Sequence, residues 1–355
     1  MTGPQIIVLA TPAFLALIGI ELIVGWWRGH NTYRMNDALN SIGLGVMSQL
    51  SGLFETLFTV AVYALAFTHL ALWRLPADAA WVWAAGLLAY DFCYYWYHRF
   101  GHTVALCWAA HGVHHQSEDY NLSTALRQTS TGFVHRWLFY LPMAVLGFPP
   151  LVFGVVGLVQ LLYQFWPHTQ QIGRMGEFDR WFCSPSNHRV HHAVNDVYLD
   201  RNYGGILMVW DRLFGSFQEE LEAQPCVYGT RAPLRSWNPL RANLHGYADM
   251  ARDSWHAQRW ADKLRVWFMH PGWRPADVAR RWPRPAFDLQ RVERFDPAMS
   301  AAAQRLVLAL FVAMLGATTL FLWNAHRLNA AQQAIVAVAI GGGLWLVGRV
   351  SESRR

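Results

Sequence analysis

Charge is scarce in this chain of 355 residues. Asp, Glu, Lys and Arg make up 15% of it, whereas soluble domains average about 25%. Cysteine is scarce too: there are four, with no C-x-x-C pair, which argues against a disulfide framework and a zinc ribbon. Apolar residues are abundant at 54%, and the 19 tryptophans belong to a residue type enriched at membrane interfaces. The composition therefore predicts an integral membrane protein.

Two metal-binding patterns are also absent. The chain has no E-x-x-H, which the facing helices of carboxylate di-iron bundles carry. It has no H-E-x-x-H either, which excludes a zinc protease of that type. Any metal chemistry in this chain must therefore use a different set of ligands.

The chain contains six apolar runs, and the first two are long enough to cross a bilayer, for which a helix needs about 20 residues. The double proline at Pro149–Pro150 breaks one run into a helical hairpin. The runs are Ile6–Trp27, Ala38–Trp73, Trp81–Tyr97, Phe133–Trp166, Leu306–Trp323 and Ala334–Val347. They predict an all-α membrane protein with six or seven spanning helices. The first is expected to be an anchor rather than a removable signal peptide.

The basic residues predict which way the chain crosses the membrane. With the N-terminus placed outside, only Arg74 and Arg327 of the 29 Lys and Arg fall in outside loops, as the positive-inside rule requires. The net charge of +6 then belongs to a cytoplasmic face beside anionic lipid, and no nucleic-acid partner is expected. We expect a multi-pass protein of the inner (cytoplasmic) membrane with its chemistry on the cytoplasmic side.

The pattern divides the chain into four parts. Residues 1–80 are expected to hold N-terminal membrane helices, and residues 81–220 a histidine-rich helical domain that includes one membrane helix and the hairpin. Residues 303–355 are expected to form a last pair of membrane helices. Between them, residues 221–302 mix arginines with spaced Trp and Leu, as helices lying on a membrane surface do. A small helical cap on the soluble part fits that mixture equally well.

Half of the 16 histidines lie in three short groups. They are His98 and His102; His111, His114 and His115; and His188, His191 and His192. Residues three and four apart share one face of a helix, so each group would present its imidazoles to one side. Three such faces can converge on one point, which predicts a metal site.

Eight imidazoles are too many for one ion, because zinc usually takes four ligands. Two ions sharing the eight would be satisfied, and imidazole suits iron, zinc and copper. Five isolated histidines are expected to be solvated or packed in the core: His30, His69, His256, His270 and His326.

The pattern H-x3-H, H-x2-HH, H-x2-HH resembles the fatty acid hydroxylase/sterol desaturase superfamily of membrane di-iron oxygenases. Longer strings are most similar to the alkylglycerol monooxygenase family within it, whose members cleave ether lipids with tetrahydrobiopterin. The resemblance covers roughly residues 90–275. The strings are "YYWYHRFGH", "HHQSEDYNLSTALRQ", "LLYQFWPHT", "NHRVHH", "DRNYGGILMVWDRLFGSF", "VYGTRAPLRSWNPL" and "PGWRP".

This resemblance implies that the eight grouped histidines hold two iron ions. His168, in "FWPHT", matches a histidine of the family and is either a further ligand or a residue that supports one. The resemblance also implies dioxygen, a lipid substrate and a separate electron donor, with tetrahydrobiopterin, a ferredoxin or a cytochrome as the external reductant. One position departs from the family pattern, because Thr103 stands where an acidic residue would follow the second histidine. That departure puts the same substrate or reductant in doubt.

Metal-bound imidazoles usually give their second N–H to a carboxylate or a carbonyl. Asp91 lies seven residues before His98, on the same helical face, and is expected to pair with a ligand histidine or with Arg99. Asn121, Asp200 and Asn202 follow the second and third groups closely and are the other candidates for supporting roles.

The expected function is that of a membrane di-iron oxygenase that hydroxylates a C–H bond of a lipid, with alkylglycerol ethers as candidate substrates. The nearest alternative is a hydroxylase or desaturase of a sterol, a fatty acyl chain or an aminolipid. A membrane metal-binding or transport protein is a distant alternative. It predicts ionisable residues running through several spanning helices, whereas the apolar runs hold only Glu21, Glu55 and Asp91 as acids.

Overall fold

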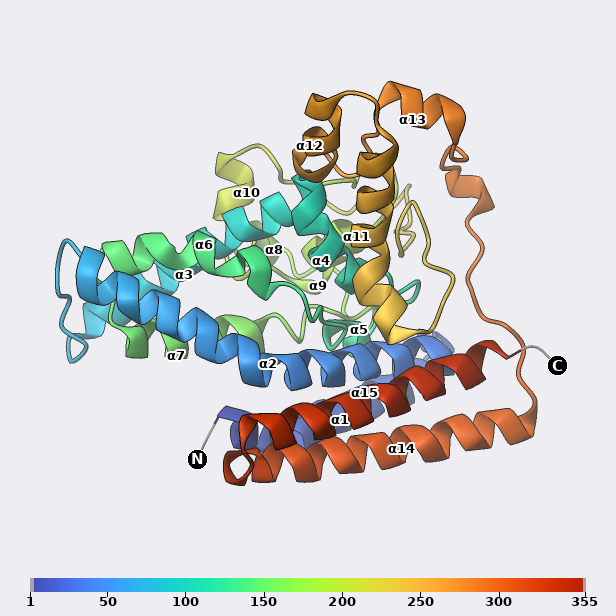
Figure 1. The fold of residues 1–355 in the computed structure, drawn as a ribbon, viewed down its shortest axis with the longest axis horizontal. Coiled ribbons are helices and arrows are strands. Elements are labelled where there is room, and N and C mark those ends of the chain that lie inside the picture. Colours follow the sequence, from blue (N-terminus) through green and yellow to red (C-terminus); the bar gives the residue numbers. More distant parts are fainter. Residues whose placement is uncertain (1–2, 354–355) are drawn as a thin grey trace.

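The structure, a computed structural model, describes residues 3–353 and is built of helices. Two isolated β-bridges, Phe182 with Leu207 and Ala193 with Tyr228, are the only extended pairings within that range. The prediction of an all-α chain is therefore confirmed. Figure 1 shows long helices running across the lower part of the molecule, with shorter helices and loops above them.

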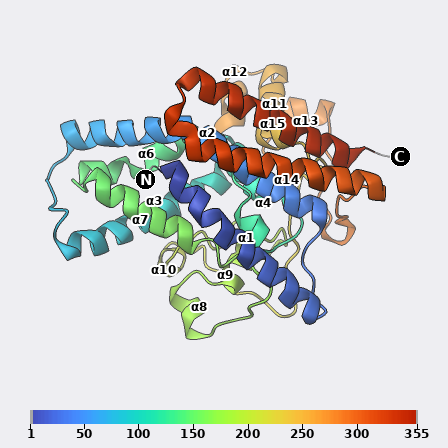
Figure 2. The ribbon, with the colours of Figure 1, turned by 90° about the horizontal axis from the view of Figure 1, so that it is seen from below.

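Four helices of the described residues are long and apolar enough to cross a membrane: α1 (Gly3–Trp27), α2 (Met35–Leu70), α14 (Ala301–Asn324) with the turn that follows it, and α15 (Ala330–Glu352). α14 and α15 form an antiparallel pair beside α2 in both ribbon views (Figure 1 and Figure 2). Phe311 and Leu344 are buried between them with Leu50 of α2. The apolar run Ala38–Trp73 thus lies almost entirely in the single helix α2.

The hairpin expected after position 133 forms as α6 (Phe133–Val145) and α7 (Pro150–Tyr163). They have 13 and 14 residues, about 20 Å at 1.5 Å per residue, which is short of the ~30 Å of a bilayer core. Gly147 has φ +90°, and a Cβ there would lie 2.1 Å from the Trp73 carbonyl oxygen, so the turn needs glycine. Neither hairpin helix is long enough to span alone.

The hairpin packs on α2 and on α3 (Ala80–Thr103). Their shared core is aromatic: Tyr63 and Phe153 stack with ring centroids 4.0 Å apart, and Tyr90 lies 4.5 Å from Tyr140. This packing fixes α3 against the membrane helices. The last two turns of α3 carry His98 and His102.

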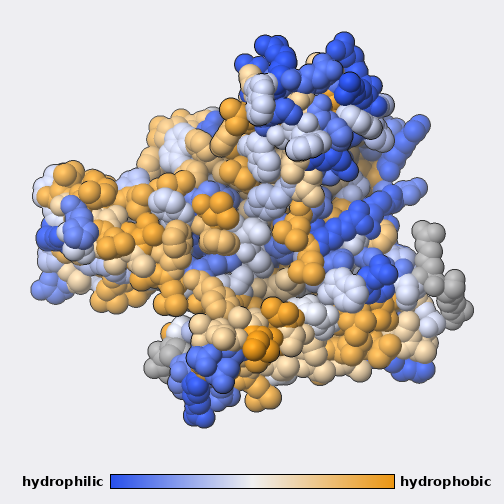
Figure 3. All heavy atoms as spheres, viewed as in Figure 1, coloured by the Kyte–Doolittle hydropathy of each residue, from blue (hydrophilic) through white to orange (hydrophobic). Residues whose placement is uncertain are grey.

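The remaining helices lie between residues 105 and 327. They are α4 (Ala105–His115), α5 (Leu122–Ala125), α8 (Glu177–Trp181), α9 (Pro185–His192), α10 (Val209–Leu213), α11 (Pro239–His256), α12 (Trp260–Phe268) and α13 (Ala276–Arg281), with 3-10 turns η1 (Leu289–Arg291) and η2 (Ala325–Arg327). Figure 3 shows hydrophobic side chains gathered over the lower and left parts of this face, and hydrophilic ones over α11–α13. The polar part therefore sits to one end of the apolar helices.

Candidate metal centre

The three helices predicted to carry the grouped histidines are present as α3, α4 and α9. α4 follows α3 after a single residue, Val104. α9 begins with Ser184, whose hydroxyl accepts from the Asn187 N–H, and with Pro185 in its first turn, both of which favour a helix start. These local signals place eight imidazoles, together with His168 from the loop after α7, in one buried region.

The nine histidines sort into two groups. His98, His102, His111, His115 and His191 form the first, and His114, His168, His188 and His192 form the second; within each group one ligand atom per residue lies within 4.8 Å of all the others. The rings of His115 and His192 have centroids 4.3 Å apart, so the two groups adjoin. The structure thus brings together all eight predicted residues and adds the ninth.

The sorting does not follow the sequence groups, because each three-histidine helix serves both metal groups. On α4, His111 and His115 turn to the first group and His114 to the second. On α9, His188 and His192 turn to the second group and His191 to the first. Residues four apart differ by about 40° around a helix, whereas adjacent residues differ by about 100°. The expectation that the imidazoles of one helix share one side holds for His98 and His102 on α3, and it is wrong for α4 and α9.

Hydrogen bonds orient the imidazoles of the second group. The Nδ1–H of His114 donates to the Arg127 carbonyl at 2.8 Å, and the Nδ1–H of His168 donates to the Gln164 carbonyl at 2.9 Å. A carbonyl only accepts, so both rings carry their proton on Nδ1 and have a lone pair on Nε2. Those two Nε2 atoms lie 3.1 Å apart. Two lone pairs face each other at that distance favourably only when a cation binds both.

The first group likewise brings Nε2 atoms close together. His98 donates from Nδ1 to the Tyr203 carbonyl at 2.8 Å, and its Nε2 lies 3.0 Å from Nε2 of His111. The Nε2 atoms of His102 and His191 are buried and have no hydrogen-bond partner. A buried polar atom without a partner normally costs about 1–3 kcal/mol. A metal ion bound to the five nitrogens would remove that cost, so the residues fit such a group.

Burial also keeps these imidazoles in the neutral form that binds metal. It lowers the pKa of His114 to about 4 and, together with the neighbouring imidazoles, holds the pKa of His111, His191 and His192 well below the usual 6.5. Neutral imidazole is the form that binds metal. At neutral pH no proton has to leave these rings before a cation enters.

A four-residue segment, Asp200–Tyr203, supports three imidazoles of the first group. The Asp200 carboxylate lies 3.5 Å from Nδ1 of His102, the Arg201 carbonyl accepts from Nδ1 of His191 at 3.0 Å, and the Tyr203 carbonyl accepts from His98. Asp200 and Asn202 have φ of +57° and +56°, a conformation that Asp and Asn tolerate better than most residues. With these two residues at positive φ, the Asp200 carboxylate and the carbonyls of Arg201 and Tyr203 all face the histidines.

The predicted supporting residues Asp200 and Asn202 thus lie beside the site, with different contacts. Asp200 also accepts from Nε2 of His270 at 2.9 Å. Burial alone would raise the pKa of the Asp200 carboxyl, but the hydrogen bonds from His102 and His270 lower it. Asn202 touches no imidazole; its amide donates to the carbonyls of Asn187 in α9 and Gln218, which holds the segment against the histidine helix.

Asp91 does not pair as expected. Its carboxylate accepts from the Gln160 amide, the backbone N–H groups of Ile206 and Leu207, and the Trp210 indole, at 2.8–3.1 Å. No hydrogen bond joins it to a histidine or to Arg99. Asp91 is buried as expected, but backbone N–H groups of the loop after Tyr203 occupy its carboxylate oxygens. Asp91 therefore supports His98 only through that loop.

Asn121 lies farther from the imidazoles. It is the N-cap of α5, where its side-chain oxygen accepts from Ser123 and its amide donates to the Thr32 carbonyl. α5 leads to Arg127, whose carbonyl orients His114 and whose buried guanidinium lies 3.6 Å from Asp37 of α2. Asn121 therefore acts on the site through the backbone of this turn. Thr103 donates to the Arg99 carbonyl of its own helix.

Sequence reasoning missed two contributors. His270 was assigned to ordinary surface or core, yet it holds the carboxylate beside His102. Tyr203 contributes a backbone carbonyl, which no side-chain pattern reports. The only signal for either lay in the quoted strings: "DRNYGGILMVWDRLFGSF" contains Tyr203, and "PGWRP" begins directly after His270. The other isolated histidines, His30, His69, His256 and His326, lie outside both groups.

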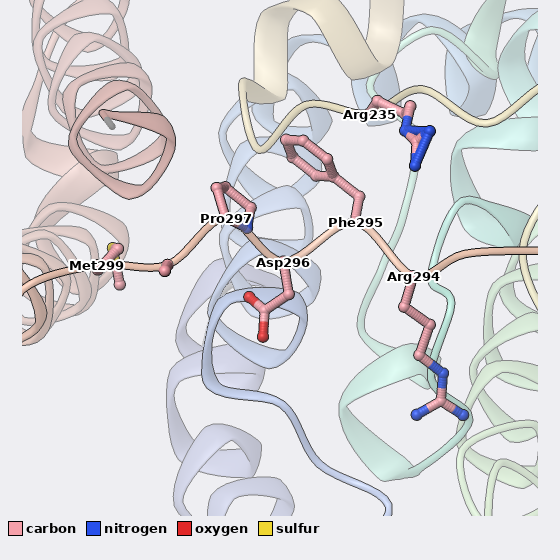
Figure 4. A pocket seen from close by; sticks show the side chains of 7 residues that line it. Arg235, Arg294, Phe295, Asp296, Pro297 and Met299 are labelled. Carbon is pink, nitrogen blue, oxygen red and sulfur yellow. The ribbon is translucent and has the colours of Figure 1, made fainter. Parts of the chain in front are cut away.

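An open cavity of about 660 Å³ lies elsewhere, lined by Arg235 and residues 294–299 (Figure 4). It contains none of the nine histidines. Its two arginines are already paired, Arg235 with Glu293 at 3.7 Å and Arg294 with Asp119 at 3.3 Å. The candidate functional site is therefore the cluster of nine histidines, and this cavity is not part of it.

Comparisons with known proteins agree with this geometry. The family model for fatty acid hydroxylase matches residues 83–216, which include all nine histidines. Alkylglycerol monooxygenase from Homo sapiens is 40% identical over 273 residues, covering 77% of this chain and 61% of the human protein. The Danio rerio enzyme is 36% identical over 322 residues, covering 88% of this chain and 70% of that protein.

A more distant relative is the ornithine lipid hydroxylase OlsE of Rhizobium tropici, 27% identical over 222 residues, or 60% of this chain and 66% of that protein. No solved structure matches the chain. The matched part thus spans about three fifths of the human relative and rather more of the zebrafish one. With 36% identity over 70% of the zebrafish enzyme, the chain belongs to the alkylglycerol monooxygenase family.

Proposed function

We propose that this protein is a membrane di-iron oxygenase that hydroxylates a C–H bond of a lipid, with alkylglycerol ethers as its substrates and tetrahydrobiopterin as the external reductant. The observation that carries the proposal is the pair of facing Nε2 lone pairs of His114 and His168, 3.1 Å apart in a buried group of four imidazoles. A group of five imidazoles adjoins it. The names of the relatives supply the substrate class.

The proposed ligands are the nine histidines of the two groups, with His168 as a full member of the second. Five imidazoles exceed the four ligands that zinc usually takes, whereas iron is among the metals that imidazole suits. Bound iron would supply the activation of dioxygen for attack on a C–H bond. The supporting residues would be Asp91, Asn121, Asp200 and Asn202, acting through the contacts described above.

The chain's own residues have three tasks in this reaction. Carbonyls keep the ring protons of His98, His114 and His191 on Nδ1, and the Asp200 carboxylate does so for His102, so that the Nε2 lone pairs of these four rings stay free. Burial of the rings excludes water from the reacting centre. The apolar helices α2, α3 and α6 offer an alkyl chain a route along the membrane to the histidines.

The overall reaction balances when the reductant supplies two electrons. One oxygen atom enters the carbon next to the ether oxygen, and the other leaves as water with two protons. The product of that step is a hemiacetal, which separates into a fatty aldehyde and glycerol. The same site acting on a carbon without an ether neighbour would give a stable alcohol.

We place the N-terminus outside and the histidines on the cytoplasmic side of the inner membrane. Beyond the four long helices, α3, α6 and α7 would also enter the bilayer, which makes seven membrane helices; the short hairpin enters without crossing. Exposed Leu138, Leu151 and Leu161 on the hairpin support this, since they would otherwise face water. We also propose that the chain is divided into the four parts 1–80, 81–220, 221–302 and 303–355 described above.

The part between 221 and 302 combines both expected roles in this proposal. α11 and α12 pack on α4 as a cap. At the same time Trp255, Trp260, Leu264 and Phe268 are 80%, 82%, 66% and 65% exposed, beside the cations Arg259 and Lys263. Apolar side chains flanked by cations suit the surface of a bilayer with anionic lipid. We propose that this edge of the cap rests on the cytoplasmic leaflet.

A second candidate function is hydroxylation of an aminolipid. Two observations favour it: Thr103 occupies the position expected to be acidic, and a relative is an ornithine lipid hydroxylase. Thr103 bonds within its own helix and contacts no imidazole, so the metal groups would be the same for both functions. The two candidates differ in the product, which is an aldehyde for the ether lipid and a hydroxylated lipid for the other.

The test uses membranes that contain either the wild-type chain or His114→Ala. Each receives an alkylglycerol, dioxygen and tetrahydrobiopterin, and fatty aldehyde is measured. Aldehyde from the wild type alone supports substrate, reductant and site together. Absence of aldehyde from iron-loaded wild type would reject the ether-lipid function. Mass spectrometry of the host's own lipids would then show whether an added oxygen appears on an aminolipid.

A further inference from the structure

His135, in the first turn of α6, is 6% exposed, and neither of its ring nitrogens has a hydrogen-bond partner. It belongs to neither metal group. Among the described residues, His135 is the one histidine with both ring nitrogens buried and unpaired. His102 and His191 each have one such nitrogen, and there a metal ion explains it. At His135 a different partner is needed.

The position of His135 connects it to the metal centre through two tyrosines of α3. Its ring centroid lies 5.8 Å from that of Tyr97, the residue that precedes His98. The Tyr97 ring lies 6.2 Å from Tyr94, and the Tyr94 ring lies 5.2 Å from His98 of the first metal group. Tyr94 and Tyr97 are partly buried. One short row of rings thus leads from His135 to a proposed iron ligand.

A role for His135 in packing alone does not explain its polar atoms. Each buried donor or acceptor without a partner costs about 1–3 kcal/mol, and an apolar ring of similar size at this position would avoid both costs. The rings packed on the same side of α3 and α6 include Phe139 and Tyr140, so an aromatic residue is accommodated there. The two unpaired ring nitrogens of His135 instead fit a bound ligand that forms hydrogen bonds with both of them.

The chemistry of imidazole narrows the ligand. A neutral ring offers one N–H donor and one lone-pair acceptor, which match the acceptor and donor of an alcohol. A carboxylate could pair only with the donor and an ammonium group only with the acceptor. A head group with two neighbouring hydroxyls can use both nitrogens. Attached to an alkyl chain that lies among α2, α3 and α6, it would hold the carbon beside the ether oxygen near the first metal group.

We propose that His135 is a binding residue for the hydroxyl groups of an uncharged lipid head group, in a subsite bordered by Tyr97. The proposal rests on the proposed function for the identity of the lipid, and on the unpaired nitrogens of His135 for the site itself. It makes His135 a determinant of specificity for hydroxylated head groups. The metal ligands and their supporting residues are separate from it.

The test compares His135→Phe, which keeps an aromatic ring but removes both polar atoms, with His135→Asn, which keeps one donor and one acceptor. His69→Phe is the matched control, because His69 is an exposed histidine in the last turn of α2 and belongs to neither metal group. The full chain, loaded with iron in lipid nanodiscs and kept free of dioxygen, is titrated with an alkylglycerol. A second titration uses an alkyl ether of the same chain length in which both hydroxyls are replaced by hydrogen. Iron content and thermal midpoint are measured for every variant.

We expect His135→Phe to weaken alkylglycerol binding at least tenfold and to change binding of the deoxygenated ether less than twofold, with iron content unchanged. His135→Asn should recover part of the loss, and His69→Phe should bind as the wild type does. Equal weakening for both ligands would overturn the proposal, because it would show a packing role. Unchanged binding of the alkylglycerol would overturn it as well.

Binding without dioxygen separates this proposal from the proposed function. If the wild type forms no aldehyde but His135→Phe selectively loses the hydroxylated ligand, the ether-lipid function fails and the subsite stands. If the wild type and His135→Phe form aldehyde with the same KM, the function stands and the subsite is rejected.

Discussion

Asn202→Ala is the substitution that tests most directly how the segment after Asp200 holds the first metal group. Asn202 has φ +56°, a conformation that costs a residue with an ordinary Cβ about 1–2 kcal/mol and asparagine less. Its side chain makes three hydrogen bonds, to the Asn187 and Gln218 carbonyls and from the Gln218 N–H, at 2.8–3.0 Å. At about 0.5–1.5 kcal/mol each, their loss and the backbone cost together predict a destabilisation of about 2–5 kcal/mol.

The same substitution should loosen one metal group and spare the other. Arg201 and Tyr203, on either side of Asn202, present the carbonyls that orient His191 and His98, both of the five-histidine group. Loss of such support typically weakens metal binding about 10–100-fold. The four-histidine group takes its recorded carbonyl contacts from Arg127 and Gln164. We therefore expect one iron per chain to become sensitive to chelator while the other remains bound.

The assay is iron content after dialysis against graded chelator, with the thermal midpoint measured in parallel. Asn202→Gly should recover about 1 kcal/mol relative to alanine, because glycine accepts positive φ, but should lose the same iron. Asn195→Ala is the control: Asn195 is a buried asparagine that bridges the Pro225 carbonyl and the Val227 N–H and supports no histidine carbonyl. It should lower the midpoint and keep both irons. Equal loss of both irons from Asn202→Ala, or of neither, would refute the reasoning.

Three further outcomes follow from the same contacts. His115→Ala and His192→Ala should each reduce iron from two ions per chain to one, from opposite groups, and the double variant should hold none, as metal analysis of purified protein would show. Asp91→Ala leaves four donors without their acceptor and should cost about 4 kcal/mol or more, measured as a fall in thermal midpoint that iron loading does not reverse. For the metal-free chain, burial lowers the pKa of His114 to about 4 from about 6.5 when unfolded, so the unfolded state binds more protons between those values. The free energy of unfolding should therefore fall as the pH drops from about 6.5 to 4. Above about pH 7.5 His114 should contribute no pH dependence. A thermal midpoint that rises on acidification would contradict the assignment.

Much of the site could be predicted from spacing, because H-x-x-H-H on a helix leaves few alternatives for eight imidazoles. His168 was named as a candidate only through a family string, since an isolated histidine in a loop carries no spacing signal of its own. The division into groups of five and four depends on how α4 and α9 are rotated against each other. That rotation is decided by tertiary packing, and neither helix reports it alone.

The supporting residues show the same limit. Asp91 was expected to reach an imidazole because both lie on one face of α3, but backbone N–H groups from residues 206 and 207, more than a hundred residues later, occupy its carboxylate. Long helices such as α2 and α14 were predictable from hydropathy. The hairpin was recognised by Pro149–Pro150, yet its shortness was not, because an apolar run does not reveal where helical hydrogen bonds stop.

The crossed assignment of histidines has a consequence for how such a centre can change over time. His114 and His115 are chain neighbours that serve different metal groups, as are His191 and His192. A deletion or insertion of one residue in α4 or α9, or a turn of either helix about its axis, would disturb both ions together. A substitution of one side chain can act on a single ion, but any change in the length or rotation of α4 or α9 alters the ligands of both ions.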